Sequence, residues 1–219
     1  MRDFYNQSIE SGNYTSSYES YVATLEQAHK VANSGADGTN AWYHKAGHGT
    51  LDVNAGQIRN DALGLRSNRV EEGMYVEDLA RKYGDPYRTD GSSRVQLEGI
   101  SPDAQPQNIF TRHHYPAGIH MDQYLKQMHR TAQEALDLIQ KAAPQDEILR
   151  KLAEHYQYAI NARPFGQINN SFFMNEINTL LEKAGMRTMP HGMLDHAAQR
   201  MQPEAFTRYF IDEYKRTAL

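Results

Sequence analysis

The chain has 219 residues, of which 39% are apolar, and a formal net charge of −4 at pH 7, which is enough apolar content for one domain with a sizeable core. The negative charge argues against a general nucleic-acid-binding protein, and the lack of cysteine excludes disulfides and thiolate ligands. No stretch approaches the roughly 18 consecutive apolar residues of a membrane-spanning helix.

Residues 1–16 are polar and rich in serine, asparagine and tyrosine, and we expect a flexible or loosely docked arm there. Residues 17–219 are expected to form a single domain. Ser16 followed by Glu19 has the pattern of a capping box, and an apolar helical stripe continues from there to a stop near Gly35.

The next segment, residues 33–70, is rich in loop-forming residues. His44 and His48 would share one face of a helix, but the glycines around them argue against a regular helix and no third ligand is evident. We therefore expect surface or core histidines and no metal site. Residues 51–69 carry several arginines and are expected to form a solvated polar hairpin.

Residues 76–83 are expected to form a short helix, and residues 84–118 a long connection with a short strand at Val95–Leu97. Long connections of this kind are usually functional or mobile. The connection is therefore a second segment, besides 50–70, that we consider for partner binding.

The second half of the chain has strong helical periodicity. Apolar stripes predict helices over 121–142, 146–160 and 173–184, and Pro203 is well placed at the first position of a last helix. Asp195 and His196 are neighbours in sequence and so do not face each other on a helix, which argues against a catalytic dyad.

The connection between two of these helices, residues 162–173, holds the most specific pattern. Pro164 disfavours helix at Arg163, Gly166 permits a bend, and Asn170 or Ser171 is a suitable N-cap for the next helix. A helix N-terminus presents free backbone N–H groups and the positive end of the helix dipole. The sequence therefore predicts an anion-binding site at this loop.

This loop resembles the motif of the Fic/Doc (Fido) family, His-Pro-Phe-x-(Asp/Glu)-Gly-Asn-Gly-Arg. Pro164, Phe165 and Asn169 match the motif. The other five positions differ from the motif. Where the motif has histidine, the acid, the first glycine, the second glycine and arginine, this chain has, in turn, Arg163, Gln167, Ile168, Asn170 and Ser171.

The surroundings of the loop also resemble the family. His155 lies in a helix similar to the one that carries a His-x-x-Phe pattern before the motif, and Gly56-Gln57-Ile58-Arg59 resembles a Gly-x-Phe-Arg element near a flap. The resemblance implies a mainly α, Fic/Doc-like helical domain with a small β-hairpin flap. It also implies that Gly56, Ile58 and Arg59 contact a partner protein by strand addition.

Most members of the family transfer AMP from ATP to a protein hydroxyl, with the motif histidine as base and the acid holding Mg²⁺. The guanidinium of Arg163 cannot act as that base, and Gln167 offers only an amide carbonyl, so we expect neither conventional AMP transfer nor strongly held Mg²⁺. The resemblance leaves Arg163, Asn169 and His155 as catalytic candidates. Residues that would hold a nucleotide are Arg163, Gln167, Asn169, Asn170 and Ser171.

Two functional hypotheses follow. The first is an atypical Fic-like transferase, similar to AvrB-type bacterial effectors, that binds a nucleotide or other phosphate-bearing ligand and modifies a target protein. It would be cytoplasmic or secreted into a host cell by a bacterial secretion system. A Ser/Asn-rich N-terminus is typical of proteins that such systems secrete. The second is a catalytically inactive Fic-fold scaffold that acts through protein–protein interaction. In that case Arg163 caps a helix, residues 169–171 serve as turn and cap residues, and His155 belongs to the core.

Overall fold

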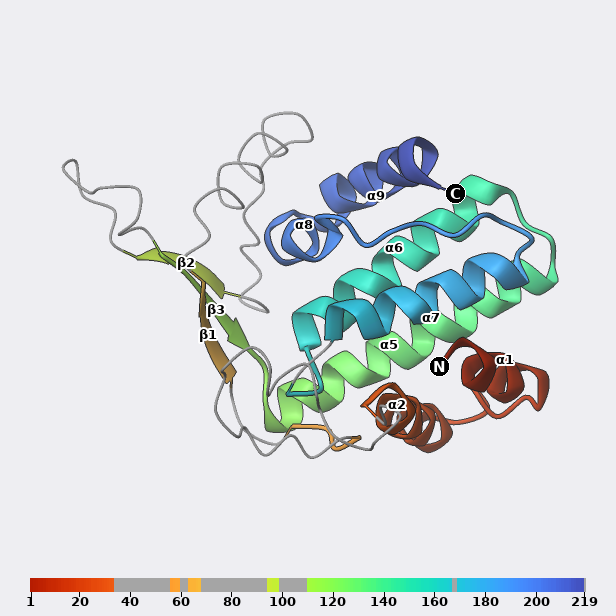
Figure 1. Cartoon of the computed structure of the whole chain (residues 1–219), viewed down its shortest axis with the longest axis horizontal. Coiled ribbons are helices and arrows are strands. Elements are labelled where there is room, and N and C mark those ends of the chain that lie inside the picture. The colour runs from red at the N-terminus through yellow and green to blue at the C-terminus, as the bar shows by residue number, and fades with distance from the viewer. Residues whose placement is uncertain (34–55, 60–62, 68–93, 99–109, 167–168, 219) are drawn as a thin grey trace.

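The computed structural model describes residues 1–33, 56–59, 63–67, 94–98, 110–166 and 169–218 (Figure 1). The described part of the chain is mainly α-helical, as predicted. The helices are α1 (Arg2–Glu10), α2 (Tyr18–Asn33), α5 (Gly118–Gln140), α6 (Gln145–Ala162), α7 (Asn169–Lys183), α8 (Leu194–Arg200) and α9 (Pro203–Thr217). The strands are β1 (Leu63–Ser67), β2 (Arg94–Glu98) and β3 (Phe110–Tyr115).

Helix α6 lies at the centre of the helical body and packs against α5, α7, α8 and α9 (Figure 1). Its apolar stripe is fully buried, and Leu149, Leu152 and Tyr156 all have an exposed fraction of 0%. Asp146 and Glu147 occupy the first turn, where acidic side chains interact favourably with the helix dipole. The predicted helices over 121–142, 146–160 and 173–184 are thus confirmed as α5, α6 and α7, and Pro203 begins α9.

The N-terminal segment is docked on the body, which corrects the expectation of a flexible arm at residues 1–16. Residues 2–10 form α1, and the side chains of Tyr5 and Tyr14 are buried in the core. The ring of Tyr5 lies 6.0 Å from that of Phe172 on α7. A polar average composition concealed these aromatic anchors, since one or two buried rings are enough to hold a short segment on a surface.

The cap of α2 also differs by one residue from the expected position. The side-chain oxygen of Ser17 accepts a hydrogen bond from the backbone N–H of Ser20 at 3.0 Å. This is the N-cap geometry, so Ser17 rather than Ser16 supplies the cap.

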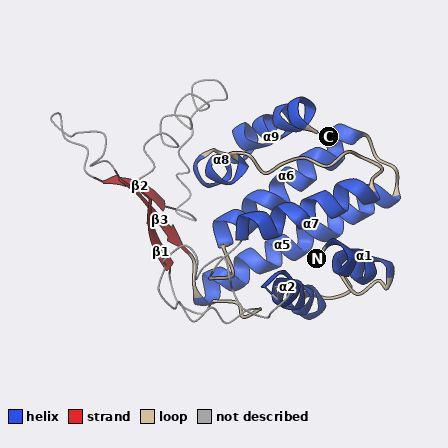
Figure 2. Cartoon of the chain, viewed as in Figure 1, coloured by secondary structure: helices blue, strands red, loops and turns tan. Residues whose placement is uncertain are grey.

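The strands form one antiparallel sheet in the order β1-β3-β2, beside the start of α5 (Figure 2). In β1, Leu63 pairs with Tyr115 of β3, and in β2, Arg94 pairs with His114 of the same strand. The predicted strand at Val95–Leu97 is confirmed within β2. Strand β1 lies in the segment expected to form a local hairpin, but it pairs with the distant strand β3. The residues next to β1 in the sequence therefore could not predict its partner.

Several predicted features lie outside the described residues. These are His44, His48, the helix over 76–83, and Gln167 with Ile168. None of the helices that the structure describes combines the length and the apolar character needed to cross a membrane.

Candidate functional site

The loop between α6 and α7 begins with a left-handed residue. Arg163 is the C-cap of α6, with φ 43° and ψ 62°, and its backbone N–H donates to the carbonyl of Ala159 at 2.9 Å. A left-handed residue is a common way to end a helix, although glycine or asparagine usually fills the position. The helix ends here because Pro164 cannot continue its hydrogen bonding.

Asn169 holds the loop in shape through both polar atoms of its side chain. Its Oδ1 accepts a hydrogen bond from the N–H of Phe165 at 3.0 Å, and its Nδ2 donates to the carbonyl of Phe165 at 2.7 Å. The Phe165 ring is buried and stacks on the ring of His29, with centroids 4.0 Å apart. Asn169 is therefore engaged with the loop's own backbone.

Arg59 caps the carbonyl end of α6. Its Nε donates to the carbonyl of Arg163 at 2.8 Å, and its Nη2 donates to the carbonyls of Ala162 and Pro116 at 3.1 and 3.2 Å. Its backbone N–H donates to the carbonyl of Pro164 at 2.7 Å. A cation at this position neutralises the negative end of the helix dipole and satisfies carbonyls that have no partner within the helix.

The rest of the predicted partner-binding element also faces inward. Gly56 has a φ of 77°, and its N–H donates to Nδ1 of His29 on α2 at 2.9 Å. Ile58 is half-buried and packs against the core. Gly56, Ile58 and Arg59 are thus brought together with the loop, but they bind the protein's own α2 and α6 rather than forming an exposed edge.

The side chain of Arg163 lies over an aromatic ring. Its Cζ is 5.2 Å from the ring centroid of Tyr115, which is the arrangement of a cation–π contact. Burial raises the pKa of the Tyr115 hydroxyl even though the positive charge of Arg163 opposes that shift. The same hydroxyl accepts a hydrogen bond from Nε2 of Gln199 at 2.9 Å.

A carboxylate of the protein stands beside the first turn of α7. The helix begins at Asn169, so Asn170 and Ser171 lie within the first turn, and neither of them is the N-cap. Asn170 Nδ2 donates to Oδ2 of Asp195 on α8, and Asp195 is only 5% exposed. A negative charge is favourable at a helix N-terminus, so Asp195 supplies there the charge that an external anion would bring.

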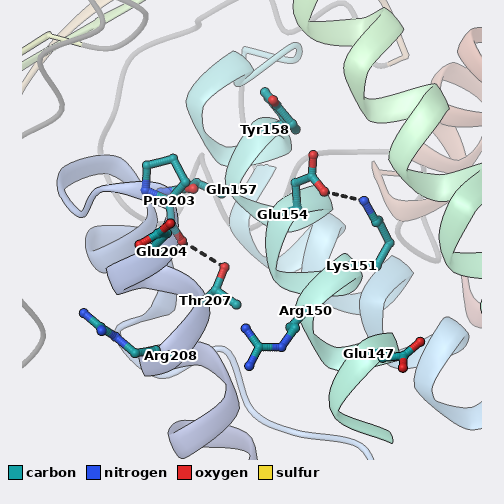
Figure 3. Close-up of a pocket in the computed structure, with 10 residues that line it drawn as sticks. All are labelled: Glu147, Arg150, Lys151, Glu154, Gln157, Tyr158, Pro203, Glu204, Thr207 and Arg208. Carbon is teal, nitrogen blue, oxygen red and sulfur yellow. Dashed lines mark hydrogen bonds and ion pairs between the residues drawn. The ribbon is translucent and has the colours of Figure 1, made fainter. Parts of the chain in front are cut away.

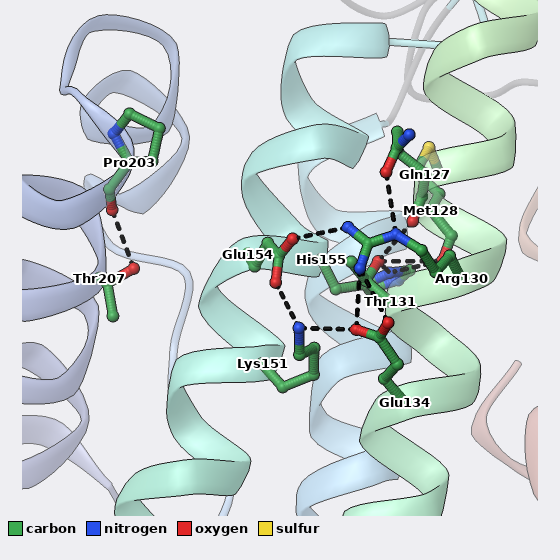
Figure 4. Close-up of polar contacts among 10 residues, drawn as sticks. All are labelled: Gln127, Met128, Arg130, Thr131, Glu134, Lys151, Glu154, His155, Pro203 and Thr207. Atoms are coloured by element: carbon green, nitrogen blue, oxygen red, sulfur yellow. Dashed lines mark hydrogen bonds and ion pairs between the residues drawn. The ribbon is translucent and has the colours of Figure 1, made fainter.

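The remaining predicted site residues lie apart from this loop. Ser171 is exposed and lines a separate small pocket of about 290 Å³. His155 is fully buried: its Nδ1 lies 2.9 Å from Oγ1 of Thr131 (Figure 4), and its Nε2 lies 3.3 Å from Oε2 of Glu176. His155 is therefore a core residue and cannot reach a substrate from this position.

A groove of about 600 Å³ lies between α6 and α9 (Figure 3). We call it the α6/α9 groove. Its lining residues are Glu147, Arg150, Lys151, Glu154, Gln157, Tyr158, Pro203, Glu204, Thr207 and Arg208. This volume falls within the range of ligand-binding pockets.

One wall of the groove is fixed by ion pairs. Lys151 Nζ lies 2.5 Å from Oε2 of Glu154 and 2.7 Å from Oε2 of Glu134, and Arg130 bridges the same two carboxylates from α5 (Figure 4). The four charges neutralise one another. They therefore stiffen the wall and contribute little charge to the groove.

Two other side chains keep unused hydrogen-bonding capacity. Gln157 is 4% exposed and donates from Nε2 to the carbonyls of Ala198 and Met201 at 3.1 and 2.9 Å, and no described residue donates to its Oε1. Arg150 is exposed, reaches from α6 toward α9 in Figure 3, and forms no ion pair with any described residue.

Sequence reasoning did not single out this groove. Glu147, Arg150, Lys151 and Glu154 follow one another at helical spacing, which is the pattern of an ordinary solvated helix face. Only the packing of α9 against α6 turns that face into a wall. Among the described residues no group of histidine, aspartate and glutamate side chains is arranged to hold a metal ion.

Comparison of the sequence with models of known protein families finds no matching family, and comparison with curated proteins finds no match.

Proposed function

We propose that this protein is a catalytically inactive, Fic/Doc-like helical scaffold that recognises a partner protein through the α6/α9 groove. The observation that carries the proposal is the carboxamide of Gln157. It is held in place by two backbone carbonyls, and its oxygen remains available inside a groove of about 600 Å³. A rigid acceptor in a stiff-walled groove suits recognition of a ligand that supplies an N–H donor.

The contacts of the central loop support a structural role for it. A general base must lie within hydrogen-bond reach of its substrate, and the guanidinium of Arg163 cannot titrate near neutral pH. His155 is fully buried, and both polar atoms of the Asn169 side chain bond to Phe165. The residues that the Fic/Doc resemblance assigned to catalysis are therefore engaged in holding the fold.

The test begins with selection of binding peptides from a phage-displayed library of random peptides, using the full chain as bait. Affinities of the selected synthetic peptides are then compared for the wild type and for Thr207→Trp. Thr207 is half-buried on the α9 wall, and an indole there would fill the groove from the surface. Peptide binding should be lost in Thr207→Trp while far-UV circular dichroism is unchanged. Equal binding by the two proteins would contradict the proposal.

The second candidate is an atypical transferase that binds a nucleotide or other phosphate-bearing ligand at the central loop. It is favoured by Nε of Arg163, which is buried without a hydrogen-bond partner among the described residues. The nearby carboxylate of Asp195 would repel such a ligand. Thermal-shift measurements with ATP, GTP and a nucleotide sugar test this second candidate. If one of these ligands raises the melting temperature of the wild type but not that of Arg163→Ala, the transferase is favoured.

A further inference from the structure

Resting on the proposed function, we infer that the occupant of the α6/α9 groove is an extended segment of another protein, with an acidic side chain opposite Arg150 and a backbone N–H bonded to Oε1 of Gln157. The inference combines two of the lining groups that have capacity left for a ligand. One is a cation with no described ion-pair partner, and the other is a buried acceptor.

The charge of Arg150 favours an acidic partner residue at its end of the groove, although Glu147 and Glu204 also line the groove and form no ion pair with a described residue. Lys151 is already bound to Glu134 and Glu154 within the fixed wall, and Arg208 has an interaction of its own. Arg150 is thus the lining cation that no described residue neutralises. Guanidinium binds carboxylates through parallel hydrogen bonds, so an aspartate or glutamate is its natural complement.

The buried acceptor favours a peptide backbone. Because Nε2 of Gln157 is already bonded to Ala198 and Met201, the carboxamide cannot rotate to offer a donor without losing two hydrogen bonds. It therefore accepts only, and a backbone N–H is the most abundant donor on an extended protein segment. Tyr158 and Pro203 also line the groove and supply apolar surface there.

The spacing of the two groups sets the register of the partner. Arg150 and Gln157 are separated by two turns of α6, which corresponds to about 10 Å along the helix axis. An extended chain advances about 3.3 Å per residue. The acidic side chain should therefore lie about three residues from the residue whose N–H binds Gln157.

The charge test uses the peptides selected above and two reversals of the same size, Arg150→Glu and Lys141→Glu. Lys141 is exposed at the end of α5 and lies outside the groove, so it serves as the matched control. Selected peptides should share an aspartate or glutamate, and Arg150→Glu should weaken their binding by about tenfold, whereas Lys141→Glu should not. Replacing the acidic residue of the peptide by lysine should restore binding to the Arg150→Glu protein.

The backbone contact is tested by changing the peptide alone. Methylation of each peptide nitrogen in turn should weaken binding by about tenfold or more at one amide, about three residues from the acid. Peptides without a shared acid, or equal effects of Arg150→Glu and Lys141→Glu, would overturn the inference. If Thr207→Trp still abolishes binding in that case, the groove remains the recognition site and only its occupant is wrong. If Thr207→Trp has no effect, both proposals fail.

Discussion

The side chain of Arg59 donates a hydrogen bond from Nε to the backbone carbonyl of Arg163 at 2.8 Å, joining residues that are 104 positions apart in the sequence. Its Nη2 bonds to the carbonyl of Ala162, and its backbone N–H bonds to that of Pro164. The segment that resembles a partner-binding flap is thus the cap of the central helix. The loop after α6 keeps its shape because a distant arginine satisfies its carbonyls.

The first prediction concerns this cap. Arg59→Met should lower the free energy of unfolding by about 3 kcal/mol, because it removes several hydrogen bonds made by a charged donor to partly buried carbonyls. Arg150→Met is the control and should change stability by less than about 0.5 kcal/mol, since Arg150 is exposed. Urea denaturation measures both. Equal stability of the two variants would show that Arg59 does not hold the loop.

The second prediction concerns close packing of the same segment on α2. A Cβ at position 56 would lie 2.4 Å from Cγ of Lys30 and 2.5 Å from the carbonyl oxygen of Glu26, and the φ of 77° also disfavours a side chain. Gly56→Ala should therefore destabilise the protein by about 3 kcal/mol. A Cβ at position 166 would have no atom within 4 Å, so Gly166→Ala should leave the stability nearly unchanged. Thermal unfolding compares the pair, and a neutral Gly56→Ala would contradict the docking of residues 56–59.

The third prediction separates two buried tyrosines of the N-terminal segment. The hydroxyl of Tyr14 donates to Oε1 of the buried Glu176, whereas the hydroxyl of Tyr5 has no hydrogen-bond partner in the part of the chain that the structure describes. Tyr14→Phe should cost about 2 kcal/mol, because a buried carboxylate loses a donor. Tyr5→Phe should be neutral or slightly stabilising. Chemical denaturation of both variants checks this, and the reverse order would refute the described hydrogen bonds.

Sequence alone predicted the parts of the fold that depend on local periodicity. The apolar stripes of α5, α6 and α7, the proline that begins α9 and the strand at Val95–Leu97 are all local signals, and the structure confirms them. The docking of α1 and the pairing of β1 with β3 depend instead on contacts between distant residues. Such contacts produce no periodic pattern in the sequence, so they could not be predicted from it.

The candidate site was less predictable than the fold, for the same reason. A loop with Arg163, Asn169 and Asn170 before a helix fits an anion site. In the structure, however, Arg163 contacts Tyr115, Asn169 bonds to Phe165 and Asn170 bonds to Asp195. Which internal partner reaches a polar side chain is decided by tertiary packing.

The fourth prediction concerns alkaline pH. Burial, reinforced by the negative charge of Glu176, raises the pKa of Tyr5, Tyr14 and Tyr21 well above the ordinary value of 10.0. A pKa that is higher in the folded state gives stability that is fully present below the unfolded value and is lost as pH rises above it. Stability should therefore be flat near pH 9 and fall above about pH 10, by about 4 kcal/mol per pH unit for the three groups together.

Urea denaturation at a series of alkaline pH values, with tyrosinate absorbance recorded in parallel, measures this loss. Absorbance from these three residues should appear together with unfolding. Tyr14→Phe should remove about a third of the part of the slope that Tyr5, Tyr14 and Tyr21 contribute, and Tyr156 and Tyr115, whose pKa burial also raises, add to the rest. Gradual ionisation of all tyrosines in a protein that stays folded would contradict the described burial.

The fifth prediction uses the left-handed backbone of Arg163. Arg163→Gly and Arg163→Ala both lose the contact with Tyr115, but only glycine adopts a φ of 43° without strain. The glycine variant should be the more stable by about 1 kcal/mol. The same pair of substitutions at Arg150, inside α6, should give the opposite order by a similar amount. If the alanine variant were more stable than the glycine variant at both positions, the backbone of residue 163 would not be left-handed.

The most direct test of the account is to titrate the isotope-labelled protein with a selected peptide and to map the backbone amide chemical shifts. The account predicts that the perturbed amides lie on the groove face of α6 and α9, around Arg150, Gln157 and Thr207, and that the amides of Asn169–Ser171 stay unchanged. Perturbation centred on Asn169–Ser171, with no change on α9, would contradict it and would return the binding site to the central loop.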